Sequence, residues 1–293
     1  MHNLISCGVP FCHNWYPHHL MNPFQNCWDR VERAEAHSKT LSESWNSFLE
    51  KDAYSVESCV YSDGTGAIYV TAKYGLSFPT SFALQLGELL YQLRAALDGC
   101  VYTAAILDSW GKVPVNDHRL EFPICDSRSQ FESNTRKIAP LSEQRRLLIE
   151  AVQPYNTPEI PAEFMIGNYN RSLLILNDWA RKDRHRRLHI VGSWTSGATP
   201  KLRIPAGTRL AYMNAVSGAF LKDKCKIADF RIEGWKPSMN VQANPDLFID
   251  VALDEPPPPC AANDTFGARI TSMIHTVGVV IKGVENGVWP IHH

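Results

Sequence analysis

The sequence has none of the short motifs that mark several common enzyme classes. It contains no G-x-G-x-x-G turn, no G-x-x-x-x-G-K-[ST] phosphate loop, no G-x-S-x-G nucleophile turn and no H-E-x-x-H zinc helix. It also lacks a strong charge of one sign, since 29 Lys and Arg residues face 30 Asp and Glu residues. A net charge of −1 gives the whole chain no attraction for nucleic acid or an anionic membrane, so any such partner would need a local patch.

Long apolar runs and organised cysteine patterns are missing as well. No stretch approaches the roughly 20 apolar residues that span a bilayer, and the N-terminus lacks the basic and apolar regions of a signal peptide. The eight cysteines are scattered without a C-x-x-C pair, unlike those of a disulfide scaffold or a zinc ribbon. We therefore predict reduced cysteines, a cytoplasmic location and no membrane partner.

Residues 1–20 show no hydrophobic periodicity and predict a disordered leader. The alternative is a metal-binding tail, because the segment holds five residues of the types that bind zinc, namely Cys7, Cys12, His13, His18 and His19. Their spacing matches no closed zinc site, so the disordered leader is the favoured interpretation.

Hydrophobic spacing in the rest of the chain predicts both helices and strands. Apolar residues at helical spacing predict helices over 28–50, 81–107, 142–152, 162–190 and 270–284. Alternating segments predict strands over 54–61, 67–74, 202–204, 227–232 and 247–251. The Asp63-Gly64 turn joins the first two strands into a hairpin.

These elements predict an α+β protein. We expect a helical bundle with an inserted hairpin over residues 21–195 and a small antiparallel β region over 196–259. The C-terminal helix, within residues 260–293, would pack back on the bundle. The two parts are expected to form one unit.

Two predicted long helices carry charged residues that could meet. Arg94 and Asp98 are four residues apart on one helix, and Asp183, Arg184 and His185 lie near the end of the other. If the helices pack together, Arg94 could pair with Asp183, and Asp98 with Arg184 or His185. Such a network would fix the register of two helices. The alternative is an active site in which a histidine beside a carboxylate moves protons.

The end of the second helix is strongly basic. Five cations lie between Asp178 and His189, namely Arg181, Lys182, Arg184, Arg186 and Arg187. They could complement the helix dipole or contact the phosphates of a nucleic acid. His185 and His189 are four residues apart, a spacing that suits a metal, but no third ligand is identifiable. We predict neither a metal nor another cofactor.

Arg184 and His189 form an R-x4-H pair that resembles the motif of HEPN-type ribonucleases. That resemblance implies a helical, commonly dimeric enzyme that uses Arg and His without a metal. The motif is short, and a chain of this composition holds about two R-x4-6-H pairs by chance. The other pairs here are Arg30 with His37 and Arg269 with His275.

Three segments resemble a bacterial family, frequent in actinobacteria, that is itself uncharacterised. They are residues 28–37, 87–102 and 183–189, and the likeness extends over residues 21–284. The family reads L-R-S-A-L-D-H in the second segment and D-K-H-R in the third. Gly99 replaces the histidine of the second motif, which puts in question a catalytic role for that helix. The resemblance implies that the polar helix pair is a family feature, and it supplies no activity.

Two classes of function follow from these observations. The first is a protein that acts on nucleic acid, a metal-independent ribonuclease, with RNA as partner and a homodimer as assembly. Arg184 would stabilise phosphate charge, His189 or His185 would move protons, and Arg94, Asp98 and Asp183 would orient them. The second is a non-enzymatic protein whose Arg/Asp helix pair is structural and whose apolar cleft holds a ligand or partner.

Overall fold

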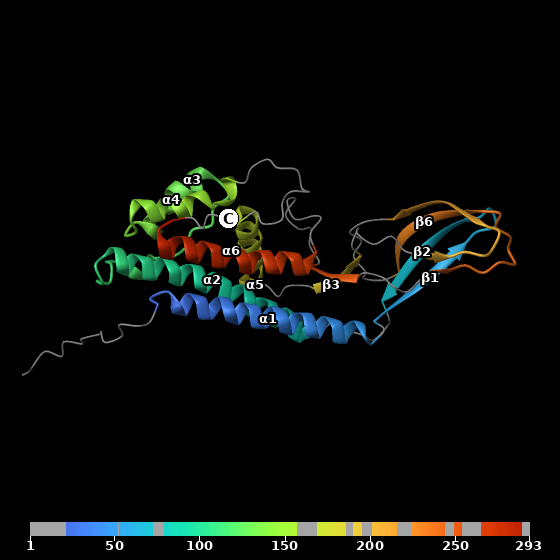
Figure 1. Ribbon diagram of the computed structural model, residues 1–293, viewed down its shortest axis with the longest axis horizontal. Coiled ribbons are helices and arrows are strands. Elements are labelled where there is room, and N and C mark those ends of the chain that lie inside the picture. Colours follow the sequence, from blue (N-terminus) through green and yellow to red (C-terminus); the bar gives the residue numbers. More distant parts are fainter. Residues whose placement is uncertain are drawn as a thin grey trace, which may run out of the picture.

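Helices and strands separate along the long axis of the protein (Figure 1). The computed structural model describes residues 22–51, 53–72, 79–156, 169–185, 190–194, 201–215, 224–243, 249–253 and 265–288. The helices gather at one end, and the main sheet lies at the other. The predicted α+β class is confirmed. The leader predicted over residues 1–20 lies outside the described residues.

The helical end is built on long helices whose apolar faces meet. Its α-helices are α1 Gln25–Leu49, α2 Thr80–Asp108, α3 Arg128–Asn134, α4 Glu143–Ala151, α5 Tyr169–His185 and α6 Phe266–Asn286. Short 3₁₀ turns cover Asp117–Arg119, Thr135–Ile138 and Pro154–Asn156. In α2, side chains such as Leu86, Leu90, Leu93 and Leu97 are completely or almost completely buried. Each contributes about 1.5–3 kcal/mol of transfer free energy, so this stripe anchors the bundle.

Helix α6 forms despite its valines and glycines, because packing outweighs their weak helix propensity. The apolar residues that predict it, Ile270, Ile274, Val277, Ile281 and Val284, are all buried. Its N-terminus is capped by Thr265, whose hydroxyl accepts from the Ala268 N–H at 3.1 Å. The helix packs against α1, α2 and α5. Among the helices of the described segments, none is long and apolar enough to cross a membrane.

The strand end is a four-stranded antiparallel sheet in the order β1-β2-β6-β5. Its strands are β1 Tyr54–Val60, β2 Thr65–Ala72, β5 Arg209–Ala215 and β6 Cys225–Glu233. Two short ribbons add β3 Ile190–Trp194 to β8 Ile249–Leu253, and β4 Leu202–Arg203 to β7 Gln242–Ala243. Gly64 takes φ +80 in the hairpin turn, where Asp63 accepts from the Thr65 N–H at 3.0 Å.

The hairpin belongs to the sheet, whereas the sequence predicts it as an insertion in the bundle. Strand β2 pairs with β6 from Thr65↔Arg231 to Val70↔Cys225. Buried residues of these two strands form a separate hydrophobic core that includes Ile68, Val70, Ile227, Phe230 and Ile232. The pairing joins strands about 160 residues apart in the chain, and local spacing carries no information on such a partner.

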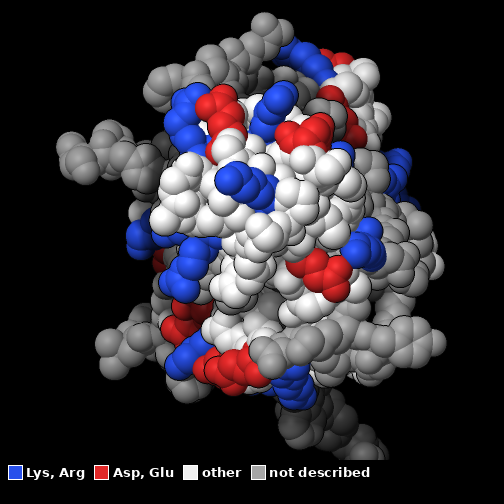
Figure 2. Space-filling model, turned by 90° about the vertical axis from the view of Figure 1, so that its right-hand side faces the viewer, with Lys and Arg blue, Asp and Glu red and all other residues white. Residues whose placement is uncertain are grey.

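The exposed side of the sheet end carries both signs of charge. Figure 2 shows Lys and Arg side chains interspersed with Asp and Glu around an uncharged centre. In the sheet region Arg209 pairs with Glu233 at 2.6 Å, and Lys224 pairs with Glu57 at 2.8 Å. The described residues of this face therefore offer no continuous cationic surface to a nucleic acid.

Candidate functional site

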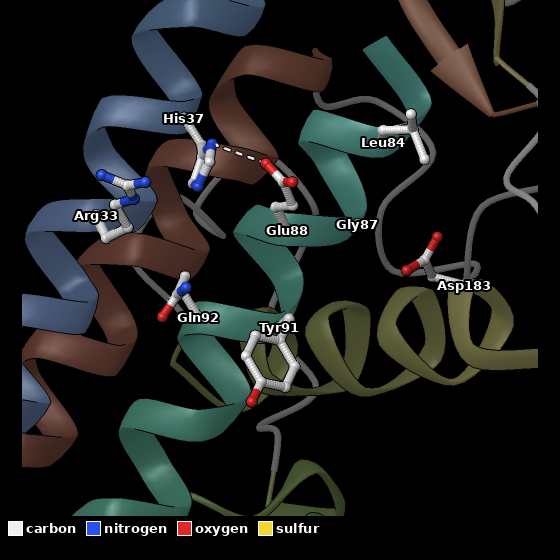
Figure 3. A pocket seen from close by; sticks show the side chains of 8 residues that line it. All are labelled: Arg33, His37, Leu84, Gly87, Glu88, Tyr91, Gln92 and Asp183. Carbon is white, nitrogen blue, oxygen red and sulfur yellow. Dashed lines mark ion pairs between the residues drawn. The ribbon is translucent and has the colours of Figure 1, made fainter. Parts of the chain in front are cut away.

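A shallow polar trough crosses the outer surface of helix α2. It has a volume of about 430 Å³ and lies between α1 on one side and the end of α5 on the other (Figure 3). Glu88 is 62% exposed and Tyr91 is 64% exposed, so the trough opens to solvent. We call it the α1–α2 trough, and it is lined by Arg33, His37, Leu84, Gly87, Glu88, Tyr91, Gln92 and Asp183.

One wall of the trough holds a histidine beside a carboxylate. His37 Nδ1 of α1 lies 3.5 Å from Glu88 Oε2 of α2 (Figure 3), and the histidine side chain is only 16% exposed. A carboxylate beside one imidazole nitrogen can hold the ring in one orientation, which leaves the other nitrogen for a substrate. This pair can therefore exchange a proton with a group bound in the trough.

A cation lies one helical turn from this histidine. Arg33 precedes His37 by four residues on α1 and lines the same trough (Figure 3). Among the described residues it makes no ion pair. An unpaired guanidinium on the wall of a cleft is suited to an anionic oxygen, above all that of a phosphate. The trough thus combines a proton carrier with an anion-binding group.

Asp183 forms the opposite wall, held against the backbone of α2. A Cβ atom on Gly87 would lie 2.5 Å from Asp183 Oδ2 and 3.0 Å from both Cγ and Oδ1. The carboxylate can take this place only because residue 87 has no side chain. Burial raises the pKa of the Asp183 carboxyl. In the described part of the chain no cation or hydrogen-bond donor is paired with it.

The sequence contains a signal for this trough in the Arg30/His37 pair. These residues are seven apart, so they share one face of α1. Arg30 Nη1 donates to Gln92 Oε1 of α2 at 3.0 Å, and His37 meets Glu88 one turn away on the same helix. In the sequence this pair is only one of three short R-x4-6-H matches. Its contacts with α2 cannot be recognised there, because they arise from helix packing.

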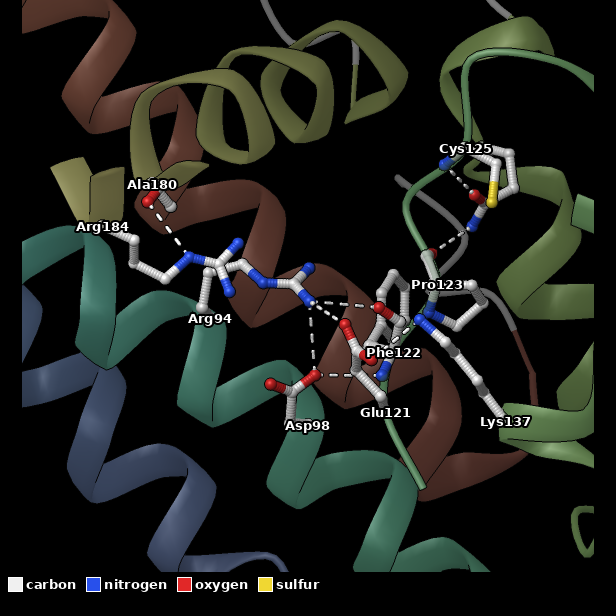
Figure 4. Close-up of polar contacts among 10 residues, drawn as sticks. Arg94, Asp98, Glu121, Phe122, Pro123, Cys125, Lys137, Ala180 and Arg184 are labelled. Atoms are coloured by element: carbon white, nitrogen blue, oxygen red, sulfur yellow. Dashed lines mark hydrogen bonds and ion pairs between the residues drawn. The ribbon is translucent and has the colours of Figure 1, made fainter. Parts of the chain in front are cut away.

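Arg94 and Asp98 form a separate cluster that holds a loop (Figure 4). Arg94 Nη2 lies 3.3 Å from Glu121 Oε1 and donates to the Phe122 carbonyl at 3.3 Å. Asp98 Oδ1 accepts from the Phe122 N–H at 2.9 Å and lies 3.5 Å from Arg94. Burial raises the pKa of the Asp98 carboxyl, and Arg94 opposes the shift only in part.

Hydrogen bonds also hold the other end of this loop, at Pro123 and Cys125. Gln153 is fully buried, and its amide accepts from the Cys125 N–H and donates to the Pro123 carbonyl, both at 2.9 Å (Figure 4). Lys137 adds an ion pair to Glu121 at 2.7 Å. Arg94 Nη1 is buried without a hydrogen-bond partner among the described residues, but the contacts of Arg94 Nη2, Asp98 and Gln153 give the cluster the geometry of a structural clamp between α2 and residues 121–125.

The predicted pairing across the two long helices is wrong. Arg94 pairs with Asp98 and Glu121 instead of Asp183, and Asp98 meets the loop backbone instead of Arg184 or His185. The physical reason is the position at which the end of α5 meets α2. Asp183 lies against Gly87, which is about two helical turns before Arg94 on α2.

The basic end of α5 is partly neutralised by its own helix. Asp178 pairs with Arg181 at 3.3 Å and with Lys182 at 2.8 Å. Arg184 is exposed, and its Nε donates to the Ala180 carbonyl at 3.3 Å (Figure 4). His185 is exposed at the last position of the helix.

The remaining residues of the basic segment, Arg186, Arg187 and His189, lie outside the described residues. The helix predicted over 162–190 does not reach Ile190, because this residue begins β3 and pairs with Leu253. Within the segments that the structure describes, no three His, Cys, Asp or Glu side chains gather as a metal site would require.

A second pocket of about 300 Å³ lies where α1, α2 and α6 meet strand β8. Apolar side chains form most of its wall, with Ser38, Ser42 and Asn46 of α1 at its polar side. Its apolar lining consists of Leu41, Trp45, Phe82, Val251, Phe266 and Ile270. This pocket has the composition expected of an apolar cleft for a small ligand.

Comparison with protein-family models, with curated proteins and with solved structures finds no match to this chain. The family resemblance drawn from the sequence therefore stays an expectation.

Proposed function

We propose that this protein cleaves RNA in the α1–α2 trough without a metal ion. One observation carries the proposal, namely His37 Nδ1 at 3.5 Å from Glu88 Oε2 with the unpaired Arg33 one helical turn away. The trough opens to solvent, as a site for a polymer requires, and the exposed residues Arg184 and His185 follow Asp183 in α5. The proposal keeps the predicted class of function and moves its centre from the α5 end to α1 and α2.

RNA supplies its own nucleophile, which suits a site of this kind. His37 takes the proton of the ribose 2′-hydroxyl as the new O2′–P bond forms. The P–O5′ bond breaks, and the leaving oxygen takes a proton from water. Arg33 stabilises the charge that develops on the phosphoryl oxygens, and Glu88 stabilises the imidazolium. The products would be a 2′,3′-cyclic phosphate and a 5′-hydroxyl end.

The test is cleavage of labelled single-stranded and structured RNA in the presence of a chelator. A positioned general base contributes about 10²–10⁴-fold to a rate, so His37→Gln should lower cleavage by that factor. The matched control is His118→Gln, because His118 is 68% exposed and lies beside Asp117 in a loop outside the trough. Equal loss in both variants, or cleavage that a chelator abolishes, would refute the proposal.

A cytoplasmic location is part of this proposal. The five cysteines among the described residues, Cys27, Cys59, Cys100, Cys125 and Cys225, are all free thiols. Free thiols fit a reducing compartment, in which RNA is also present.

The second pocket favours an alternative function, the binding of a small apolar ligand. A Cβ atom on Gly267 would meet no atom within 4 Å, so a larger side chain there can fill the pocket. In a titration with 1-anilinonaphthalene-8-sulfonate, this function predicts probe fluorescence that Gly267→Leu removes. Fluorescence that is unchanged by Gly267→Leu would place the probe elsewhere and contradict the alternative.

A further inference from the structure

The two walls of the trough present opposite chemistry. Arg33 and His37 lie on the α1 side, and Asp183 lies on the α5 side, with Gly87 between them (Figure 3). The proposed reaction uses the α1 side and leaves Asp183 without a role. A bound nucleotide has two parts with matching chemistry, because its phosphate is anionic and its base carries N–H donors.

Asp183 is prepared to accept hydrogen bonds from a ligand. Its carboxylate lies against Gly87, since both oxygens and Cγ would be within 3.0 Å of a Cβ atom placed on that glycine. In the described segments it has neither an ion pair nor a hydrogen bond, although burial already raises its pKa. A partly desolvated acceptor without a partner is costly, and a ligand that donates to it recovers that cost.

The chemistry of a carboxylate discriminates among the four bases of RNA. An ionised carboxylate only accepts hydrogen bonds, through two oxygens side by side. Guanine presents two adjacent donors, N1–H and the N2 amino group, on its Watson–Crick edge. Adenine and cytosine place an acceptor nitrogen beside their amino group, and uracil places carbonyl oxygens on both sides of its N–H, so each would face a carboxylate oxygen with a like charge.

Exposed side chains beside Asp183 offer a surface for the plane of a base. Tyr91 is 64% exposed and Leu84 is 66% exposed, and both line the trough. Figure 3 shows them on the same helix as Gly87. Bases of single-stranded RNA commonly stack on aromatic side chains while their edges are read by hydrogen bonds.

We infer that Asp183 selects guanine, so that a guanosine binds with its base on Tyr91 and Leu84 and its phosphate toward Arg33 and His37. The inference rests on the proposed function, which supplies RNA as the source of the guanosine. A free guanine nucleotide presents the same base and phosphate. The experiment therefore has to separate these two sources.

Calorimetric titration with mononucleotides tests base selection without any cleavage. The wild-type protein should bind 5′-GMP about tenfold more tightly than 5′-AMP, 5′-CMP or 5′-UMP, since one good bidentate contact discriminates by about this factor or more. Asp183→Asn should remove the preference for GMP and favour AMP and CMP, because an asparagine amide can pair with the adjacent acceptor and donor that adenine and cytosine share. The matched control is Asp178→Asn, since Asp178 lies on the same helix but pairs with Lys182 at 2.8 Å.

Equal affinity for the four nucleotides would overturn the inference, as would a GMP preference that survives Asp183→Asn or that Asp178→Asn also removes. A comparison of 5′-GMP with the dinucleotide GpA identifies the source, because an RNA site binds GpA more tightly and cleaves RNA beside guanosine. Selective GMP binding without RNA cleavage would refute the proposed function and leave a site for a free guanine nucleotide. RNA cleavage without base preference would leave the function and refute the guanine site.

Discussion

A pair of glycine substitutions in helix α2 tests the packing that builds the trough. Gly87 and Gly99 both lie inside α2, twelve residues apart. A Cβ atom on Gly99 would meet only Cys27 Sγ, at 3.4 Å, which is an ordinary contact. A Cβ atom on Gly87 would lie 2.5 Å from Asp183 Oδ2, so the Asp183 side chain would have to move.

The magnitudes follow from two opposing effects. Alanine is about 1 kcal/mol better than glycine inside a helix, so Gly99→Ala should stabilise the protein by about that amount. Gly87→Ala gains the same propensity but displaces the half-buried Asp183 carboxylate, and a side chain forced off its rotamer costs about 0.5–1.5 kcal/mol. We expect Gly87→Ala to be near neutral, and to become stabilising by about 1 kcal/mol when Asp183 is also replaced by alanine.

Urea unfolding followed by circular dichroism measures these differences. The double variant Gly87→Ala/Asp183→Ala is compared with Asp183→Ala alone, so that the effect of residue 87 is read without the carboxylate. If Gly87→Ala stabilises the wild-type protein as much as Gly99→Ala does, Asp183 does not lie against α2. The geometry of the trough and the guanine site would then both be wrong.

Three further predictions concern the rest of the bundle. Burial raises the pKa of Asp98 above 3.8, so the folded protein holds this proton more tightly than the unfolded chain. The unfolding free energy of wild type should therefore rise relative to that of Asp98→Asn as the pH falls from 7 through the raised pKa, and the gain should be complete below about 3.8. If urea unfolding shows a constant difference between the two proteins across this range, that result would contradict the burial of Asp98. Burial also raises the pKa of the Cys27 thiol to about 11, so a thiol reagent at pH 8 should label exposed Cys59 well before Cys27, as peptide mapping by mass spectrometry can show. Ser127 Oγ accepts from the Gln130 N–H at the start of α3, so Ser127→Ala should lower the unfolding free energy by about 1 kcal/mol, and an unchanged urea midpoint would argue against this cap.

Local spacing was sufficient to predict the long elements of this fold. Three features depend on residues close together in the chain. They are the apolar face of α2, the helical spacing of apolar residues in α6 and the Asp63-Gly64 turn. Helix α3 was missed because it has only seven residues, although Ser127 followed by Gln130 is a recognisable N-terminal capping pattern. The partner of the hairpin could not be predicted, since β6 lies far along the chain.

The candidate site was less accessible to sequence reasoning than the fold. His37 and Glu88 meet only because α1 packs against α2, and their separation in the chain gives no indication of that contact. The sequence singles out Arg94 and Asp98 as charged residues of one helix, but they pair with each other and with a loop and not with α5. The position of Asp183 depends on the missing side chain at Gly87, a relation that only the packed helices reveal.

The most direct test of the proposed site compares two variants in one RNA cleavage assay with a chelator present. The first carries His37→Gln with Glu88→Gln in the trough, and the second carries Arg184→Ala with His185→Gln at the end of α5. Both are matched to wild type by their urea midpoints. The account predicts that the trough variant loses at least about 100-fold in rate while the α5 variant keeps most of its activity. Full activity in the trough variant, with loss in the α5 variant, would contradict it.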